Sequence, residues 1–503
     1  MAPITGDDYL ESLRDGREVW LYGERVTDVT THPAYRNSAR SIARLYDALH
    51  DPAHRDALTA PTERGGWTHS FFRPARSTAD LLQDRSAIAT WARLSYGWMG
   101  RAPDFMASYL ATLGGNDQFY APYDANARRW HAEVEDKVWH FSHVLLNPPV
   151  DRSRPASDLH PEVVQVVGET DNGIVVSGAK LVGTGAATTN YLFVGTAGHH
   201  LERAEAAIAF IVATSSPGVK IFARPSYEYA AARTGRPFDY PLSSRFDEND
   251  ALVVFDRVEV PWENVFINGD LEKSKGFFPS SGFVHRSAFH GATRFAVKMD
   301  LILGLLLKAV KTNGSDQFRG VQVQLGEALT WRNVFWSIST AMAHEPEQWG
   351  ERGIVVPNLV HGQFYRVHAP TAYAKVKEII EQVVAGALMT AVSAVDLETP
   401  EVREYVDRYF PGAGGVAAVD KIKLMRLLWD AVGSEFAGRH QLYERNYVGN
   451  HEFVRLEALM TAERRGLADS YRAFAQQAMD DYDLAGWTSD SWPNQALPAE
   501  VAP

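Results

Sequence analysis

The sequence contains no cysteine. A chain without cysteine carries no disulfide, no thiolate nucleophile and no cysteine-ligated iron–sulfur cluster. It also lacks a long apolar run, because the longest, Leu301–Leu307, is far short of the ~20 residues that a membrane helix needs. Any redox chemistry must therefore come from a bound cofactor, and we expect no membrane-spanning segment.

Positive charge is scarce as well. The chain has 50 lysines and arginines against 62 acidic residues, which gives a formal net charge of −12. Nucleic-acid binding depends on clustered basic side chains that neutralise phosphates, and here the basic residues are scattered. The acidic beginning of the chain has no apolar core typical of a signal peptide. We therefore expect a cytoplasmic protein that binds no nucleic acid.

The common catalytic motifs are also missing. The sequence has no HExxH, Walker A, GxSxG or EF-hand pattern, and HEPEQ at His344 lacks a second histidine at the spacing that zinc requires. No metal site is predicted. The run GTGAATT, Gly183–Thr189, lacks the third glycine of a dinucleotide fingerprint, so a plain turn after a strand is favoured. Its threonines remain available to hydrogen-bond a flavin.

Hydrophobic periodicity divides the 503 residues into three regions. Residues 38–51 repeat apolar side chains at spacings of three and four, which is typical of an amphipathic helix, and helical periods return after residue 276. Residues 161–267 instead alternate with a period of two between turn signals, as in a small antiparallel barrel or sandwich. The pattern predicts an α+β protein with a mostly helical domain at 1–150, a β domain at 151–276 and a helical bundle and tail at 277–503.

Two segments stand out as a candidate site. Trp91–Phe105 reads WARLSYGWMGRAPDF, and His140–Arg152 reads HFSHVLLNPPVDR. Both look like loops leaving helices, and they place Arg101 and His143 among prolines and aromatic rings, which suits a phenol-sized pocket beside a flat cofactor. A surface arginine at a helix entry and a core histidine remain the alternatives at these two positions.

A third segment, Gly433–Tyr447, reads GSEFAGRHQLYERNY and follows an amphipathic helical run. A helix end with glycine and serine can offer backbone amides to a phosphate. An ordinary helix cap is the alternative explanation of the glycine.

Several of these blocks carry a family resemblance. They are GREVWLYGERVTDVTTHPAYRN, RLSYGWMGR, NPPVDR, YPLSSRFDENDA, PWENV, FRGVQVQLGE and WDAVGSEFAGRH. Together they resemble the 4-hydroxyphenylacetate 3-monooxygenase family, the oxygenase component of two-component FAD-dependent phenol hydroxylases. The resemblance implies an acyl-CoA-dehydrogenase-like fold with an N-terminal helical domain, a central antiparallel β barrel and a C-terminal four-helix bundle. It also implies a homotetramer.

The same resemblance implies an activity. Members of the family use reduced FAD (FADH2) and O2 to convert a phenol to a catechol at the ortho carbon, through a flavin C4a-hydroperoxide. The reduced flavin comes from a separate NAD(P)H:flavin reductase. The organic chemistry then belongs to the cofactor, while the protein supplies binding, orientation and electrostatics.

Carried over residue by residue, the resemblance assigns the phenol contacts to Arg101, Phe105 and His143, with Arg101 and His143 as the catalytic pair. It assigns FAD binding to His143, Leu145, Pro149, Val150, Asp151, Arg152, Thr184, Gly433, Ser434, Glu435, Phe436 and Arg439.

Position 105 departs from the family pattern. The arylacetate hydroxylases carry a tyrosine in R-x-P-x-Y, whereas this chain has Phe105. The segment 193–207 also differs from the loop that grips a free carboxylate in those enzymes. We therefore expect a different substrate, namely a chloro-β-tyrosyl group tethered to a peptidyl carrier protein, as in enediyne antibiotic biosynthesis.

The alternatives within this class are hydroxylases of free 4-hydroxyphenylacetate, tyrosine or hydroxycinnamate. Alternatives of another class are an acyl-CoA-dehydrogenase-like flavoprotein, which would reduce its FAD with an acyl-CoA, and an inactive scaffold that docks a carrier protein. A hydroxylase requires Arg101, His143 and Thr184, and a scaffold requires none of them.

Overall fold

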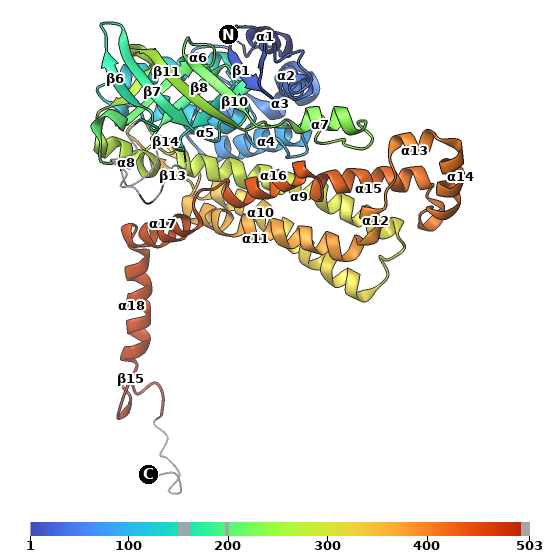
Figure 1. The fold of residues 1–503 in the computed structure, drawn as a ribbon. Coiled ribbons are helices and arrows are strands. Elements are labelled where there is room, and N and C mark those ends of the chain that lie inside the picture. The colour runs from blue at the N-terminus through green and yellow to red at the C-terminus, as the bar shows by residue number, and fades with distance from the viewer. Residues whose placement is uncertain (1, 149–152, 154–160, 197–200, 494–503) are drawn as a thin grey trace. The chain divides into compact units, whose positions relative to one another are not determined.

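The computed structural model describes residues 2–148, 153, 161–196 and 201–493. The chain forms two compact units, Met1–Tyr447 and Val448–Pro503. Every candidate site residue that the structure describes lies in the first unit (Figure 1).

The helices of the N-terminal region follow the predicted periodicity. Helix α2 buries Ile42, Leu45, Tyr46 and Leu49 along one face, which confirms the amphipathic helix predicted there. It ends at Asp51, whose side chain caps the next helix by accepting a hydrogen bond from the Ala53 amide. The helices of this region are α1 (Gly6–Ser12), α2 (Arg36–His50), α3 (Pro52–Leu58), α4 (Thr78–Leu94), α5 (Pro103–Gly115) and α6 (Asp124–Lys137).

The strands predicted between residues 161 and 267 are present and form most of two sheets. The six-stranded sheet has the order β2-β1-β10-β11-β7-β6, and the four-stranded sheet has the order β12-β9-β8-β5. The strands of these sheets are β1 (Glu18–Leu21), β2 (Glu24–Val26), β5 (Phe141–Val144), β6 (Gln165–Glu169), β7 (Gly173–Lys180), β8 (Tyr191–Gly195), β9 (Ile208–Ala213), β10 (Val219–Ala223), β11 (Ala251–Pro261) and β12 (Val265–Asn268).

The pairing differs from the expected antiparallel barrel in two respects. Strands β1 and β10 pair in parallel, as do β5 and β8, while the other pairs are antiparallel. In addition, each of these two sheets has an open strand order across the described residues. The mixed α+β class is confirmed, and the N-terminal strands β1 and β2 complete a sheet that the sequence placed entirely in the middle of the chain.

Helices make up the rest of the first unit. Figure 1 shows α9, α10 and α11 running alongside one another, and these three helices contact each other. Helix α9 is largely buried, and large apolar side chains such as Phe295, Met299 and Leu306 are enclosed. The helices are α7 (Tyr227–Thr234), α8 (Leu271–Ser280), α9 (Phe283–Thr312), α10 (Arg319–His344), α11 (Leu359–Val384), α12 (Gly386–Met389), α13 (Ala394–Glu398), α14 (Pro400–Tyr409), α15 (Ala418–Val432) and α16 (Glu435–Asn446).

The remaining elements are short or belong to the second unit. Two hairpins, β3 (Thr59–Pro61) with β4 (Trp67–His69) and β13 (Glu347–Trp349) with β14 (Ile354–Val356), lie in the first unit. The second unit contains α17 (His451–Arg464), α18 (Leu467–Asp480), β15 (Tyr482–Asp483) and β16 (Gly486–Trp487). Across the described ranges, no helix combines the length and the apolar character required to cross a membrane.

Candidate active site

The turn between α4 and α5 presents Arg101, and two glycines allow this turn to approach its neighbours. At Gly97, whose φ is +74°, an added Cβ would lie 2.6 Å from the backbone nitrogen of Lys298 on α9. At Gly100 it would lie 2.1 Å from the hydroxyl oxygen of Tyr443 on α16. The glycines of GWMGR therefore let the backbone pack directly against two helices that are remote in the sequence.

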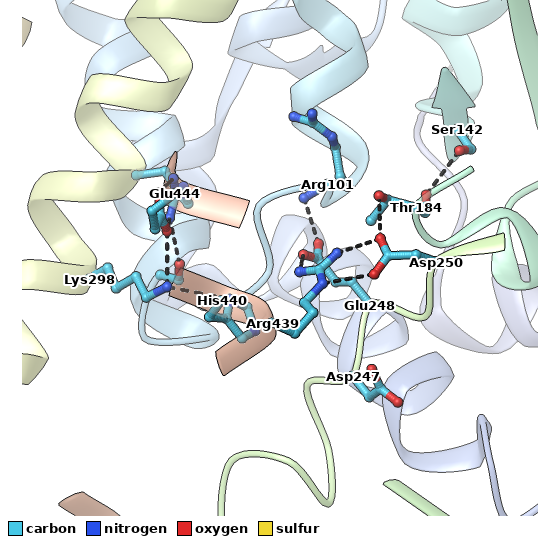
Figure 2. Close-up of polar contacts among 12 residues, drawn as sticks. Arg101, Ser142, Thr184, Asp247, Glu248, Asp250, Lys298, Arg439, His440 and Glu444 are labelled. Carbon is cyan, nitrogen blue, oxygen red and sulfur yellow. Dashed lines mark hydrogen bonds and ion pairs between the residues drawn. The ribbon is translucent and has the colours of Figure 1, made fainter. Parts of the chain in front are cut away.

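The backbone of Arg101 is anchored on one side and its side chain extends to the other. The Arg101 amide donates a 2.5 Å hydrogen bond to Glu248 Oε1, and its carbonyl oxygen lies 3.1 Å from His140 Nε2. Figure 2 shows the guanidinium directed away from Glu248. The main chain is thus fixed by the loop before β11 while the charged group remains available.

The Arg101 guanidinium lies among aromatic rings instead of carboxylates. Its Cζ is 3.9 Å from the centre of the Phe105 ring, 4.4 Å from that of Tyr447 and 5.3 Å from that of Tyr443. Its Nε and Nη1 are buried and have no hydrogen-bond partner in the described part of the chain. Stacking on ring faces stabilises such a cation only partly, so the group is well suited to bind an anionic oxygen such as a phenolate.

His143 lies close to this stack, but not on a loop. The prediction of a loop at this segment was wrong: His143 is in β5, opposite Phe193 of β8. A short apolar run such as HFSHVLL fits a strand equally well, because periodicity does not separate the two over so few residues. The His143 ring lies 5.1 Å from the Phe105 ring, so Arg101, Phe105 and His143 do come together.

The protonation of His143 follows from these surroundings. Burial, and after it the positive charge of Arg101, lowers the pKa of His143 well below its ordinary value. The ring is therefore neutral at neutral pH and presents a nitrogen lone pair. A neutral imidazole beside an arginine is a suitable pair for a phenol, because one group accepts its proton or hydrogen bond and the other stabilises the oxygen that remains.

A second group of predicted residues meets at Asp250, at the end of the DEND run. The Thr184 hydroxyl donates to Asp250 Oδ1 at 2.7 Å, and Arg439 binds the same carboxylate through Nη2 at 2.7 Å and Nε at 2.9 Å. Arg224 adds a hydrogen bond of 3.1 Å. Burial alone would raise the pKa of Asp250, but the two arginines and the hydroxyl outweigh it and hold the pKa well below its ordinary value.

The sequence did not lead us to predict Asp250 or Glu248 as site residues. Arg439 Nη1 lies 3.7 Å from Glu248 Oε2, and both atoms are buried without a hydrogen-bond partner among the described residues. Glu248 also holds the Arg101 backbone, so this short segment joins the two groups of predicted residues (Figure 2). The sequence feature that could have identified them is the presence of three carboxylates within four positions of the block YPLSSRFDENDA.

The predicted residues at the start of α16 have structural roles in the described contacts. Ser434 caps the helix by accepting from the Ala437 amide at 3.1 Å. A Cβ at Gly433 would lie 2.4 Å from the Trp429 ring, so close packing explains this glycine. Phe436 is buried against Trp98, with ring centres 5.5 Å apart, and Glu435 is exposed. Their contact with a flavin phosphate stays a prediction.

Of the other predicted flavin residues, the structure describes Leu145, which directly follows β5. It lines a small, mainly apolar pocket together with Phe193 of β8, the adjacent Thr196 and Phe278 of α8. The segment 149–152, which contains the predicted contacts Pro149, Val150, Asp151 and Arg152, lies outside the described residues.

A separate buried ionic cluster fixes α16 to α9. The Arg294 guanidinium binds both oxygens of Glu444, at 2.5 and 2.7 Å, and Lys298 Nζ lies 2.9 Å from Oε1 of the same carboxylate. Lys298 also lies 3.3 Å from His440 Nδ1. Figure 2 shows this cluster apart from the Asp250 group. It holds in place the helix that carries Arg439, Tyr443 and the residues leading to Tyr447.

Comparison with family models agrees with this geometry. The model for the 4-hydroxyphenylacetate 3-hydroxylase N terminal region matches residues 5–267, and the model for the C terminal region matches residues 274–476. The two matches include every predicted site residue.

Three known proteins illustrate the likeness. A 4-nitrophenol 2-monooxygenase oxygenase component from Rhodococcus sp is 53% identical, over 97% of this chain and 94% of its own. A (3S)-3-amino-3-(3-chloro-4-hydroxyphenyl)propanoyl-[peptidyl-carrier protein SgcC2] monooxygenase from Streptomyces globisporus is 52% identical, over 97% of this chain and 93% of its own. The crystal structure of a 4-hydroxyphenylacetate 3-monooxygenase oxygenase component with FAD and 4-hydroxyphenylacetate superposes with a TM-score of 0.88 at 30% identity, covering 95% of this chain and 99% of that chain.

Proposed function

The chain belongs to the 4-hydroxyphenylacetate 3-hydroxylase family, and from this membership we propose that it is the oxygenase component of a two-component, FAD-dependent phenol hydroxylase. It adds one hydroxyl group ortho to the hydroxyl of a phenol and so forms a catechol. One observation carries the proposal: Arg101, whose Nε and Nη1 are buried and have no hydrogen-bond partner among the described residues, lies among aromatic rings near the neutral His143.

The described residues fit a flavin cofactor. Among the described residues, Arg439 keeps a buried N–H without a partner, and such a donor suits a phosphate or a ring oxygen. Thr184, on the turn before β8, is fixed by Asp250, and the family resemblance assigns this position to FAD binding. We assign FAD binding to Thr184, Arg439, Leu145, His143 and the start of α16. When bound in its reduced form, FAD supplies the activation of O2.

The protein side chains then bind the phenol and increase its reactivity. A free phenol has a pKa of about 10, so at neutral pH it is a weak carbon nucleophile. Arg101 stabilises the negative charge on the phenolic oxygen, and His143 accepts the proton or the hydrogen bond, which together raise the electron density at the ortho carbon. The surrounding aromatic rings of Phe105, Tyr443 and Tyr447 exclude water from the charged group.

The partners follow from the same assignment. An oxygenase component receives reduced flavin from a separate NAD(P)H:flavin reductase. We also propose a homotetramer in which the C-terminal helices form a four-helix bundle and the two sheets form a barrel-like central domain, within the division 1–150, 151–276 and 277–503. Exposed apolar side chains along α10 and α11 support such packing: Phe318, Val323, Val360 and Phe364.

The substrate is a phenol with a substituent opposite its hydroxyl group. The named substrates of the two relatives at 53% and 52% identity share this feature. We propose the chloro-β-tyrosyl group on a peptidyl carrier protein, in antibiotic biosynthesis, as the physiological form. Phe105 supports a substrate other than 4-hydroxyphenylacetate, because it removes one hydroxyl from the wall of the pocket.

The test is product detection by mass spectrometry. The enzyme is supplied with FAD, NADH, O2 and an unrelated flavin reductase, and is offered a chloro-β-tyrosyl carrier protein, 4-nitrophenol and 4-hydroxyphenylacetate. We expect a gain of one oxygen, with the carrier-bound substrate turned over fastest. Faster turnover of a free phenol would overturn the carrier assignment, and no hydroxylated product from any phenol would overturn the hydroxylase itself. A reaction without reductase and NADH is the control.

A further inference from the structure

A buried chain of polar groups leads from α5 through α9 to the wall of the Arg101 stack. His290 Nε2 lies 3.2 Å from Asp104 Oδ1, and His290 Nδ1 lies 3.4 Å from the Tyr447 hydroxyl. Asp104 and His290 are 2% and 1% exposed, so water does not compete for these contacts. None of the three residues was singled out from the sequence as a site residue.

The order of the groups determines what each one does. Asp104 Oδ1 is buried and has no hydrogen-bond partner among the described residues, and it lies 3.2 Å from His290 Nε2. A carboxylate beside Nε2 favours the tautomer with the proton on that nitrogen, which leaves Nδ1 to accept from Tyr447. Asp104 therefore orients His290, and His290 orients the Tyr447 hydroxyl.

Tyr447 also belongs to the candidate pocket. Its ring lies 4.4 Å from the Arg101 Cζ and 5.7 Å from the Phe105 ring. Phe105 brings no polar atom to this wall, whereas Tyr447, whose ring also lies against the guanidinium, brings a hydroxyl. A side chain that contacts both the cation and its aromatic partner is placed to contact a ligand of that cation.

The Tyr447 hydroxyl stays protonated in these surroundings. Burial raises the pKa of Tyr447 to about 12, although the positive charges of Arg101 and Arg294 act in the opposite direction. Glu444 and Asp104 face the group as well and raise its pKa further. At neutral pH the side chain is therefore a neutral hydroxyl, able to donate one hydrogen bond and to accept another.

We propose that the Tyr447 hydroxyl turns its single proton from His290 Nδ1 to the phenolic oxygen held by Arg101, with His290 and Asp104 as the residues that position the hydroxyl group. This inference rests on the proposed function and deepens it, because it names a specificity determinant of the same pocket. The hydroxyl compensates for the polar atom absent at Phe105, from a helix end far along the chain. It selects ring substrates that carry an oxygen at the position of the phenol hydroxyl.

The first experiment compares two ligands in one variant. Tyr447→Phe keeps the ring over Arg101 and removes only the hydroxyl. For the phenol that the wild type hydroxylates in the assay above, we expect the dissociation constant with FAD-loaded enzyme to rise roughly 10-fold or more, as a hydrogen bond to a charged oxygen is lost. The inhibition constant of the same molecule without its phenolic hydroxyl should stay within about twofold, because it never made that bond.

The second experiment tests the positioning residues. His290→Gln and Asp104→Asn should weaken phenol binding in the wild type, and should add nothing in the Tyr447→Phe background, because they act through its hydroxyl. FAD affinity and the melting temperature of each variant report whether it folds. Tyr373→Phe is the matched control, since it also removes a buried hydroxyl, one on α11 without a hydrogen-bond partner among the described residues, and should leave phenol binding unchanged.

Two results would overturn the inference. Equal weakening of the phenol and its dehydroxy analogue would show that Tyr447 only packs, and unchanged phenol binding in Tyr447→Phe would show that its hydroxyl does not contact the substrate. In both cases the wild type still hydroxylates phenols, so the failure is distinct from failure of the proposed function, in which the wild type forms no product.

Discussion

Arginines occur in two contrasting environments in the first unit. Arg294 and Arg439 each bind a carboxylate through two hydrogen bonds, to Glu444 and Asp250 respectively. Among the described residues, Arg101 has no carboxylate at its guanidinium, which lies among aromatic rings instead. Paired arginines fix α16 to the rest of the fold, whereas the unpaired arginine keeps its hydrogen-bonding capacity for a ligand.

The energetic consequences differ accordingly. Removing one partner of a buried ion pair leaves the other charge uncompensated, which is strongly destabilising. Removing the partly buried Arg101 relieves some desolvation cost and sacrifices its ring contacts and the interaction with its ligand, but no ion pair among the described residues. Substitutions in the paired region should therefore affect stability, and those around Arg101 should affect catalysis.

The largest effect is expected from Glu444→Gln. This change leaves Arg294 and Lys298 buried without an anion, so the free energy of unfolding should fall by about 3–5 kcal/mol. Urea denaturation followed by circular dichroism measures it. Asp407→Asn is the control, because its ion pair with Arg403 is exposed and should contribute little. Equal losses in both variants would contradict the distinction.

Arg101→Gln should separate activity from stability. We expect kcat/KM for phenol hydroxylation to fall roughly 100- to 1000-fold, the cost typical of losing a group that stabilises a developing oxyanion. The melting temperature should change little, because the substitution breaks no ion pair among the described residues. Product formation with saturating reduced FAD and a thermal unfolding scan measure the two quantities. A fall in melting temperature as large as that of Glu444→Gln would refute the assignment.

Thr184→Val tests the link between the Asp250 group and the cofactor. Valine matches the shape of threonine but removes the 2.7 Å hydrogen bond to Asp250, which should lower the free energy of unfolding by about 1 kcal/mol. FAD binding, followed by flavin fluorescence, should weaken by a similar free energy. Thr184→Ser keeps the hydroxyl and is the control, expected to bind FAD like the wild type.

The smallest effect concerns the protonation of His143. Burial and Arg101 both lower the pKa of His143, so Arg101→Gln should raise it, while burial still keeps it below the ordinary value. NMR titration of labelled histidines measures this shift. His440 is an internal control, because burial, Lys298, Arg439 and Arg294 lower its pKa and Arg101 is not among the causes.

The sign of the associated stability change follows by linkage. In the wild type the unfolded chain protonates His143 near pH 6.5, whereas the folded state does so only at lower pH. The folded state therefore loses stability as the pH falls below about 6.5. Raising the folded-state pKa, as in Arg101→Gln, should make this particular loss smaller. A larger loss in that variant would argue against the assigned cause.

The local hydrophobic pattern of the sequence was sufficient to predict much of the fold. Spacings of three and four predicted helix α2 correctly, and alternation predicted the strands between residues 161 and 267. Pattern did not reveal that β1 and β2 join the same sheet, because strand pairing between residues 18–26 and 219–223 depends on the tertiary fold. The short run around His143 was assigned to a loop and is a strand.

Prediction of the candidate site from the sequence was limited in the same way. The structure brings Arg101, Phe105 and His143 together, as the family resemblance implied, and Thr184 and Arg439 meet at a common partner. That partner, Asp250, had no distinguishing local pattern beyond a run of carboxylates. Contacts between side chains more than a hundred residues apart leave no periodicity in the sequence, so the links through Glu248, His290 and Tyr447 emerged only from the coordinates.

The close approach of Gly100 to Tyr443 has a consequence for biosynthesis. The two sides of the Arg101 pocket are roughly 350 residues apart in the chain, and a ribosome adding about 5–20 residues per second makes the second side roughly 20 to 70 seconds after the first. During that interval Phe105 and the rings around it have no α16 to pack against. Nascent chains therefore expose an aromatic surface that the finished protein covers, and chaperone binding during translation should be concentrated there until α16 docks.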